Sequence, residues 1–236
     1  MKYKIPGYGW LKVNESERKK ITSQTGQAAF VKSHYADILK ESSALKQVVS
    51  KLKNVETIAD AMAGCGFSVA VLKSVFPDSK LILNDWDKQC YENLKLNFPE
   101  SSIANEDINK WELWGKVDLL FIDFNNFTLK RIDDWKPTIL RLSEKCKNLI
   151  ITDSACFGFR MGNLKTYGVE TPAQYYGLLE KELGLKEKSL THFSIFGNAA
   201  LVLFQPLPKY GVPHPIKEVK WEPLKIWKAE DNSLLS

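Results

Sequence analysis

The sequence has 236 residues, of which 44% are hydrophobic and 26% charged, values typical of a soluble globular protein with a sizeable core. No run approaches the roughly 20 apolar residues of a membrane-spanning helix, and the 11% of aromatic residues argues against intrinsic disorder. The net charge of +5 is unevenly placed, because residues 1–55 hold 11 Lys and Arg against 4 Asp and Glu. Such a basic segment fits either a solvated helical surface or contact with an acidic partner such as nucleic acid.

The first 14 residues, rich in glycine and aromatic side chains, predict an irregular or short β segment. Apolar residues at helical spacing follow over 15–53, with a break into two helices predicted at Ser23, Thr25 and Gly26. Beyond residue 54, short apolar runs alternate with helical segments. Strands are predicted at 57–61, 80–84, 102–106, 117–123, 148–153, 189–196 and 199–204. Helices are predicted at 67–75, 88–97, 131–143 and 171–183.

This alternation predicts an α/β fold, a doubly wound and mostly parallel seven-stranded sheet with an N-terminal helical extension. The last two strands flank Gly197 and Asn198, so the sheet is expected to end in an antiparallel hairpin. Three segments result. They are a basic helical extension over 1–54, the α/β domain over 55–205, and a Pro-rich tail over 206–236 that we expect to pack on the core.

Polar residues follow four of the predicted strands, at the edge where open parallel sheets bind ligands. The first strand runs into Asp60 to Gly66, whose two glycines precede a helix with free N–H groups. The second ends at Asp85, a carboxylate that can accept two hydrogen bonds from a ribose diol. Asp107 follows the third strand and Asp123 ends the fourth. Polar residues after four successive strands indicate a ligand-binding edge more specifically than any single motif does.

Together these residues resemble the class I S-adenosylmethionine-dependent methyltransferases over about residues 55–205. Asp60 to Gly66 looks like the family's glycine-rich first motif, and Asp85 looks like its ribose-binding acid. Asp107 looks like the adenine-contacting acid, and Asp123 begins what looks like the motif after the fourth strand. The resemblance implies a Rossmann-like methyltransferase fold, S-adenosylmethionine as cofactor and no metal. The implied cofactor site comprises Asp60, Ala63, Gly64, Cys65, Gly66, Phe67, Asp85, Trp86, Asp107, Ile108 and Asp123.

The stretch 84–97 is similar to tRNA guanine methyltransferases in particular, whereas two positions depart from the family. Met62 stands where the first glycine is usual, and Asp-Phe-Asn-Asn-Phe at 123–127 replaces the common Asp-Pro-Pro-Tyr type of motif. The acceptor atom is therefore left open.

Asp123, Asn125 and Asn126 are the catalytic candidates. A carboxylate or amide oxygen there can accept a hydrogen bond from an exocyclic amine and orient its lone pair for attack, which is most of what methyl transfer requires. The alternative interpretation is an Asx turn that closes the loop.

Several other residues admit a second interpretation. Cys156 follows the fifth strand, where some pyrimidine C5 methyltransferases place a nucleophile, although a free cysteine is more often a small buried residue. Arg160 suits a phosphate or carboxylate contact and equally a surface role.

Tyr3, Tyr8 and Trp10 suit a lid over the cofactor or ordinary packing. The three histidines are too scattered to suggest a metal site.

The sequence therefore predicts a methyltransferase that acts on an amine of a nucleic-acid base, with the basic N-terminal segment beside the substrate. A small molecule or a protein side chain is the alternative substrate, and a non-catalytic cofactor-binding scaffold is the second alternative. A nicotinamide dehydrogenase is disfavoured because Val69 stands where its third glycine belongs. Four scattered cysteines, with no C-x-x-C or zinc spacing, and the lack of a signal-peptide stretch lead us to expect a cytoplasmic protein without a membrane partner.

Overall fold

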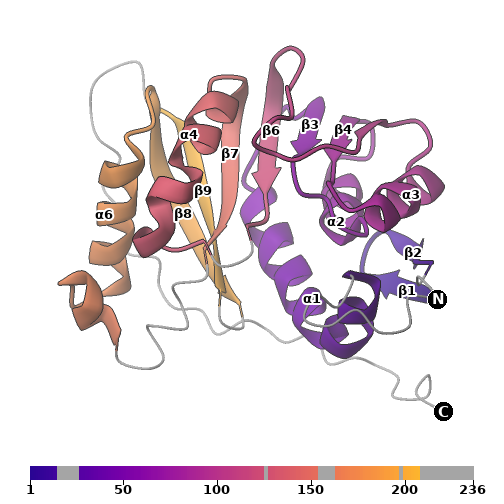
Figure 1. Ribbon diagram of the computed structural model, residues 1–236, viewed down its shortest axis with the longest axis horizontal. Coiled ribbons are helices and arrows are strands. Elements are labelled where there is room, and N and C mark those ends of the chain that lie inside the picture. Colours follow the sequence, from indigo (N-terminus) through magenta and orange to yellow (C-terminus); the bar gives the residue numbers. More distant parts are fainter. Residues whose placement is uncertain (15–26, 125–126, 154–162, 197–198, 208–236) are drawn as a thin grey trace.

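A computed structural model describes residues 1–14, 27–124, 127–153, 163–196 and 199–207. Its main sheet has seven strands in the order β5-β4-β3-β6-β7-β9-β8 (Figure 1). The strands are β3 (Thr57–Asp60), β4 (Lys80–Asn84), β5 (Ser102–Ala104), β6 (Val117–Ile122), β7 (Cys146–Asp153), β8 (Lys188–Phe196) and β9 (Ala199–Pro206). The pairings among β3 to β7 are parallel, and β9 pairs antiparallel with both β7 and β8. The predicted doubly wound sheet with a terminal hairpin is confirmed.

Helices cover both faces of this sheet. The first face carries α1 (Gln27–Val49), α2 (Phe67–Val75) and α3 (Lys88–Asn97). The second face carries α4 (Ile132–Ser143) and α6 (Pro172–Leu183). Successive strand residues alternate between the two layers, so that Phe121 packs with the first group and Leu120 with the second. Two short 3-10 helices, η1 (Leu129–Arg131) and η2 (Asn163–Tyr167), flank α4 and α6 on the N-terminal side.

Local sequence signals account for where these helices begin and end. Asp87 caps α3 by accepting hydrogen bonds from the backbone N–H groups of its first turn. Thr171 and Gln174 form a reciprocal capping box at the start of α6, and Gly184 ends that helix in a left-handed conformation. The predicted bounds of β4, α2 and α3 agree with the structure.

Other predicted elements differ in extent. Strand β5 is shorter than predicted, β7 begins two residues earlier, and η2 was not predicted. The predicted helix break at 23–26, the turn at 197–198 and the tail from residue 208 lie outside the described residues.

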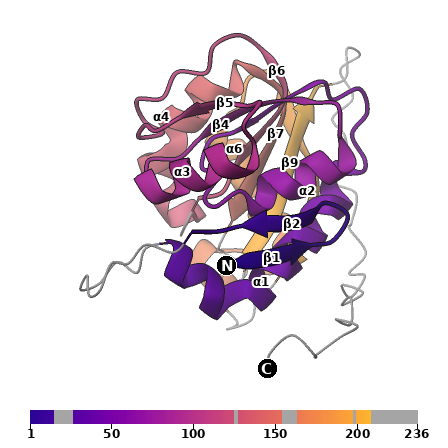
Figure 2. The ribbon, with the colours of Figure 1, turned by 90° about the vertical axis from the view of Figure 1, so that its right-hand side faces the viewer.

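The first residues form a separate two-stranded antiparallel sheet of β1 (Lys2–Ile5) and β2 (Gly9–Lys12). Figure 2 shows this hairpin in front of α1 and α2. Tyr3 packs edge-on against Phe67, the first residue of α2, and Tyr8 packs against Phe98. The short β segment is confirmed, and these two tyrosines belong to the packing of the first layer.

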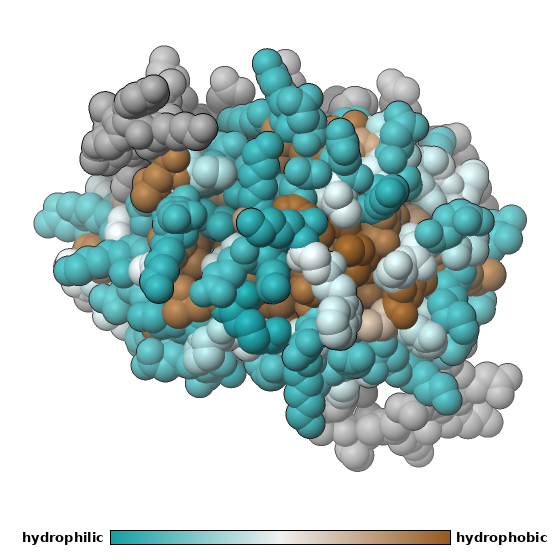
Figure 3. All heavy atoms as spheres, turned by 90° about the horizontal axis from the view of Figure 1, so that it is seen from above, coloured by the Kyte–Doolittle hydropathy of each residue, from teal (hydrophilic) through white to brown (hydrophobic). Residues whose placement is uncertain are grey.

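Helix α1 lies against α2, β8 and β9, and in Figure 1 the arrowhead of β6 points toward it. Its buried residues Leu45, Val48 and Val49 belong to the first core cluster. Most of the face at the opposite edge of the sheet, which Figure 3 shows from above, is hydrophilic. Within the described ranges, no helix is both long and apolar enough to cross a bilayer.

Candidate functional site

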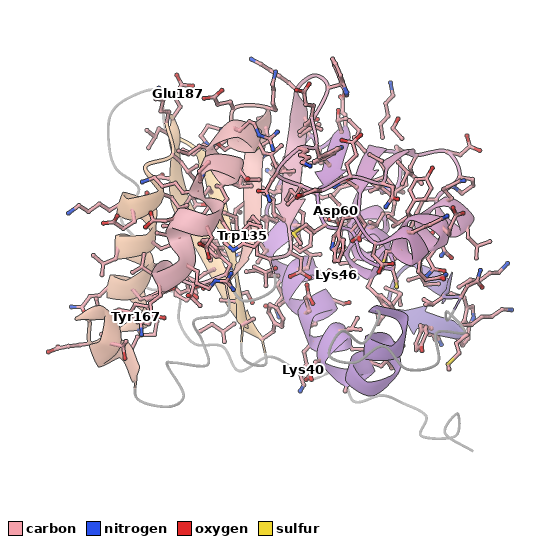
Figure 4. All side chains as sticks on the ribbon, viewed as in Figure 1. Lys40, Lys46, Asp60, Trp135, Tyr167 and Glu187 are labelled. Atoms are coloured by element: carbon pink, nitrogen blue, oxygen red, sulfur yellow. The ribbon has the colours of Figure 1, made fainter. Side chains whose placement is uncertain are left out.

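Strands β3, β4 and β6 end side by side, and each end leads into a loop that carries polar groups. In Figure 4, Asp60 at the end of β3 lies above Lys46 and Lys40, two residues of α1. We call this edge of the sheet, where the predicted site residues gather, the carboxyl edge.

The loop after β3 is held to the neighbouring strands by its own backbone. The Ala61 N–H donates to the Phe121 carbonyl at 3.0 Å, and the Ala63 N–H donates to the Asn84 carbonyl at 2.9 Å. Gly64 and Gly66 have φ of 54° and 93°, a left-handed region that favours glycine. A Cβ at Gly66 would lie 2.6 Å from the Phe98 ring. This glycine is thus required by packing on Phe98 as well as by its backbone conformation.

Asp85, the predicted ribose acid, is only 2% exposed and is oriented by two backbone donors. One carboxylate oxygen accepts from the Gly64 N–H and the other from the Asp87 N–H, both at 2.8 Å. Burial raises the pKa of Asp85 to about 6, although both hydrogen bonds act to lower it. Asp85 therefore joins the glycine-rich loop to the start of α3, and each oxygen keeps a lone pair for a further donor.

Asn84 is a site residue that the sequence analysis missed. Its side chain is fully buried, and its amide nitrogen donates to the carbonyls of Ala61 and Glu106 at 3.1 and 3.0 Å. Its amide oxygen accepts from the Glu106 N–H at 3.1 Å. One side chain thus ties together the loops after β3 and β5. A polar residue that ends a buried strand is the only sequence signal of this role.

Asp60 has no exposed surface, and its carboxylate accepts from the Ser68 hydroxyl at 2.6 Å and from the Met62 N–H at 3.3 Å. Burial is the main cause that raises the pKa of Asp60 to about 7. The Ser68 hydrogen bond opposes this shift, and the negative charge of Asp123 adds to it. Asp123 and Asp85, from the ends of the two neighbouring strands, thus lie close enough to raise the pKa of Asp60.

Asp123 is partly buried after β6, and it forms a hydrogen bond with Glu41 of α1. Burial raises the pKa of Glu41 well above its usual range, and the charges of Asp123 and Asp60 raise it further. Burial also raises the pKa of Asp123, while its hydrogen bond with Glu41 lowers it. Glu41 and Asp123 are therefore neighbouring acids whose pKa values are both raised by burial.

Glu41 was not predicted, because nothing in the helical pattern of 15–53 distinguishes it from a surface residue. The other catalytic candidates, Asn125 and Asn126, lie outside the described residues, as do Cys156 and Arg160. Of the proposed acceptor group, only Asp123 can be placed.

Asp107 and Trp86 lie at the outer part of the carboxyl edge. Asp107 is exposed and accepts from the backbone and side-chain nitrogens of Asn109 at 2.9 and 3.1 Å. Its neighbour Ile108 is buried, and the Arg141 guanidinium donates to the Ile108 carbonyl at 2.8 Å. The Trp86 side chain, directly after Asp85, is 63% exposed. Arg141 of α4 thus holds the loop after β5 in place, and the exposed Trp86 side chain follows the neighbouring strand β4.

Three predicted cofactor residues, Ala63, Cys65 and Phe67, turn their side chains into the core. The Cys65 sulfur lies 3.8 Å from the Cys90 sulfur without a disulfide bond between them, a proximity that the sequence spacing did not suggest. These residues can therefore face a ligand only through their backbone.

Comparison with known proteins identifies the fold. No family model and no curated protein matches the sequence. The structure of the plantazolicin methyltransferase BpumL in complex with SAH (S-adenosylhomocysteine) covers 77% of this chain and 91% of its own, with a TM-score of 0.55 and 12% identity. Human N-acetylserotonin methyltransferase in complex with SAM (S-adenosylmethionine) covers 80% and 61%, with a TM-score of 0.51 and 14% identity.

An O-methyltransferase family protein from Burkholderia thailandensis is similar over 78% of this chain and 61% of its own, with a TM-score of 0.52 and 16% identity. These likenesses show that the chain has the class I methyltransferase fold. The finer similarity to tRNA guanine methyltransferases stays a prediction.

Proposed function

We propose that this protein is an S-adenosylmethionine-dependent methyltransferase that modifies an amine of a nucleic-acid base. The observation that carries the proposal is the adjacency of two sets of acids at one edge of the sheet. Asp85 and the glycine-rich loop provide groups suited to a nucleoside, and the pair of Asp123 and Glu41 lies beside them. Two proteins with the same fold, BpumL and human N-acetylserotonin methyltransferase, were solved with SAH or SAM.

The residues at the carboxyl edge fit this cofactor. Asp85 would accept the two ribose hydroxyls with its remaining lone pairs, and the backbone around Gly64 would face the amino-acid portion. Trp86 offers an exposed ring for the adenine to stack on, and Asp107 an acceptor for its amino group. The bound cofactor supplies an electrophilic methyl group on a positively charged sulfur.

The acids of the carboxyl edge favour the binding of a positively charged ligand. Burial raises the pKa of Asp60, Asp123 and Glu41, and the charges of Asp123 and Asp60 raise the pKa of Glu41 further. A positive charge between them would reverse this effect, since an opposite charge within a few ångströms favours the ionised form of a carboxyl group. The sulfonium carries such a charge.

Asp123 would hold and deprotonate the acceptor amine. Its carboxylate accepts a hydrogen bond from the amine and so points the nitrogen lone pair at the methyl carbon. The amine nitrogen would take the methyl group that the cofactor's sulfur releases, and Asp123 would take up the amine proton. Because burial raises the pKa of Asp123, its carboxylate takes up this proton more readily than an exposed aspartate would. Glu41 keeps the carboxylate in position through its hydrogen bond.

Two observations favour a nucleic acid as the substrate. Residues 1–55 carry a net charge of +7, and the hairpin and α1 that they form lie on the same layer as the glycine-rich loop. The similarity of residues 84–97 to tRNA guanine methyltransferases points the same way. The competing candidate is a small molecule or a protein side chain, and the two ligand-bound proteins of the same fold are named for the methylation of plantazolicin and of N-acetylserotonin.

The test is transfer of an isotopically labelled methyl group from S-adenosylmethionine to a mixed panel of RNA, single- and double-stranded DNA, amine metabolites and protein. Digestion of the nucleic acids to nucleosides and mass spectrometry would identify the modified base. We expect label on a base amine with the wild-type protein and not with Asp123→Asn. Label confined to metabolites or protein would support the competing substrate class, and no turnover of the cofactor on any substrate would support a non-catalytic scaffold.

A further inference from the structure

The β1–β2 hairpin has one buried and one exposed face. Tyr3, Ile5 and Leu11 point into the core. The other face carries Lys2, Lys4, Trp10 and Lys12, which we call the outer hairpin face. Lys2 stands opposite Lys12 and Lys4 opposite Trp10 in the strand register. The indole of Trp10 is 54% exposed, so a large aromatic ring lies among three cations on a small sheet.

This arrangement is costly for the isolated protein. Like charges directly opposite each other destabilise a strand pair, and a two-stranded sheet is marginal on its own. The ion pairs within the described residues all lie on helical segments and involve none of these lysines. An acidic partner would relieve the repulsion, whereas a solvated surface gains nothing from placing Lys2 against Lys12.

The hairpin is fixed rigidly to the candidate site. The Asn97 side chain of α3 accepts from the Lys12 N–H at 2.8 Å and donates to the Lys12 carbonyl at 2.6 Å. The Asn93 side chain accepts from the Asn14 N–H at 2.9 Å. The amide nitrogen of Asn93 also lies 3.7 Å from the sulfur of Cys65, which belongs to the glycine-rich loop. One helix, α3, therefore connects the end of the hairpin to the loop at the carboxyl edge.

We propose that the outer hairpin face binds a single-stranded segment of the nucleic-acid substrate, with Lys2, Lys4 and Lys12 on its phosphates and one base stacked on Trp10. Lysines that track a backbone beside an exposed aromatic ring are the combination that single-strand-binding proteins use. A duplex fits less well, because its bases already stack on one another. This inference rests on the proposed function, since it assumes that the substrate is a nucleic acid.

The test is fluorescence anisotropy with labelled 12-nucleotide RNA and DNA strands over a range of salt concentrations. Trp10→Ala should weaken binding roughly 5- to 100-fold, the usual range for one lost base stack. Changing Lys2, Lys4 and Lys12 together to Gln should lower the slope of log affinity against log salt by about 2, since each single-strand phosphate contact contributes about 0.7.

Matched controls exist at the opposite edge of the sheet. Trp114 is 82% exposed, and Lys80, Lys116 and Lys145 are exposed residues just before or at the start of β4, β6 and β7. Trp114→Ala and the change of these three lysines to Gln remove the same chemical groups and should leave the affinity and the salt slope unchanged. Thermal unfolding of each variant checks that all of them fold, because exposed side chains contribute little to stability.

The outcomes separate the two proposals. If the wild-type protein methylates nucleic acid while the hairpin variants bind strands as tightly as it does, the outer hairpin face is not the binding surface and the proposed function stands. If the wild-type protein neither binds strands nor methylates them, both proposals fail. Equal competition by an acidic peptide of matched charge, with no loss of strand affinity in Trp10→Ala, would show simple charge attraction and overturn the stacking role.

Discussion

The two halves of the carboxyl edge hold their acids in different ways. At the ends of β3 and β4, Asp60 and Asp85 accept hydrogen bonds from backbone N–H groups and the Ser68 hydroxyl. After β6, Asp123 has a second acid, Glu41, as a partner. The first half is preorganised by the main chain, whereas the second half sets two acids with raised pKa values beside each other.

This difference suggests how the work of a methyltransferase would divide. A nucleoside is the same in every reaction cycle, so its binding groups can be fixed rigidly by backbone hydrogen bonds. An acceptor has to arrive, lose a proton and leave, which suits a carboxylate whose charge depends on its neighbour. The predictions below alter one half at a time.

The largest effect is expected from Asp85→Ala, which removes the acid of the preorganised half. Gly64 and Asp87 lose the carboxylate that orients both loops, and the cofactor would lose its ribose acceptor. We expect no S-adenosylmethionine binding detectable by calorimetry.

The matched control for this variant is Asp118→Ala. Asp118 lies at the other end of β6 and also accepts from two backbone N–H groups, those of Glu56 and Thr57, at 3.0 Å each. It should lose stability to a similar degree and keep the wild-type cofactor affinity. Wild-type affinity in Asp85→Ala would refute the ribose assignment.

Asp123→Asn alters the other half and should reduce methyl transfer roughly 100- to 10,000-fold, the usual loss when a general base is removed. Cofactor affinity should change little by comparison. The melting temperature should not fall, because the substitution relieves the crowding of acids that raises the pKa of Glu41. A full turnover rate would assign the proton to another acceptor, and a lower melting temperature would attribute the defect to folding.

The pH dependence of the free energy of unfolding should reveal the raised pKa of the buried Asp60. Because the pKa of Asp60 is raised to about 7 in the fold, the folded state binds more protons than the unfolded state between about pH 4 and pH 7. The free energy of unfolding then falls as pH rises through this window, by at most about 1.4 kcal/mol per pH unit for one group. Denaturant unfolding of Asp60→Asn should show a shallower decline than wild type, and an unchanged slope would contradict the raised pKa.

The smallest effect is expected from Trp86→Ala. Loss of one stacking ring should weaken S-adenosylmethionine binding about fivefold, since aromatic contacts of this kind contribute about 1 kcal/mol. Calorimetry measures the change, and Trp114→Ala provides a control with a more exposed indole. Equal affinities in both variants would place the adenine away from Trp86.

Much of the fold could be predicted from the sequence because its signals are local. The bounds of α2 and α3 follow from apolar spacing and from Pro77 and Pro99 beyond their ends. The sequence signal for strand β5 was weaker, because this strand has only three residues. The capping box and the terminal glycine of α6 are equally local signals.

The site was harder to predict from the sequence, because several of its contacts join residues that are distant along the chain. Asp60, Asp85 and Asp123 could be predicted to gather because parallel strands end at one edge. The role of Glu41 depends on how α1 crosses that edge, which is decided by the packing of Leu45 and Val48 in the core. The fit of Gly66 against Phe98 likewise joins residues that are distant in sequence.

The most direct test of the central claim is a crystal structure of the protein with S-adenosylhomocysteine. The account predicts that the two ribose hydroxyls donate to the Asp85 carboxylate, that the amino-acid portion lies against the backbone at Gly64, and that the sulfur is directed toward Asp123. A ligand bound away from the ends of β3, β4 and β6, or one whose ribose does not contact Asp85, would contradict it.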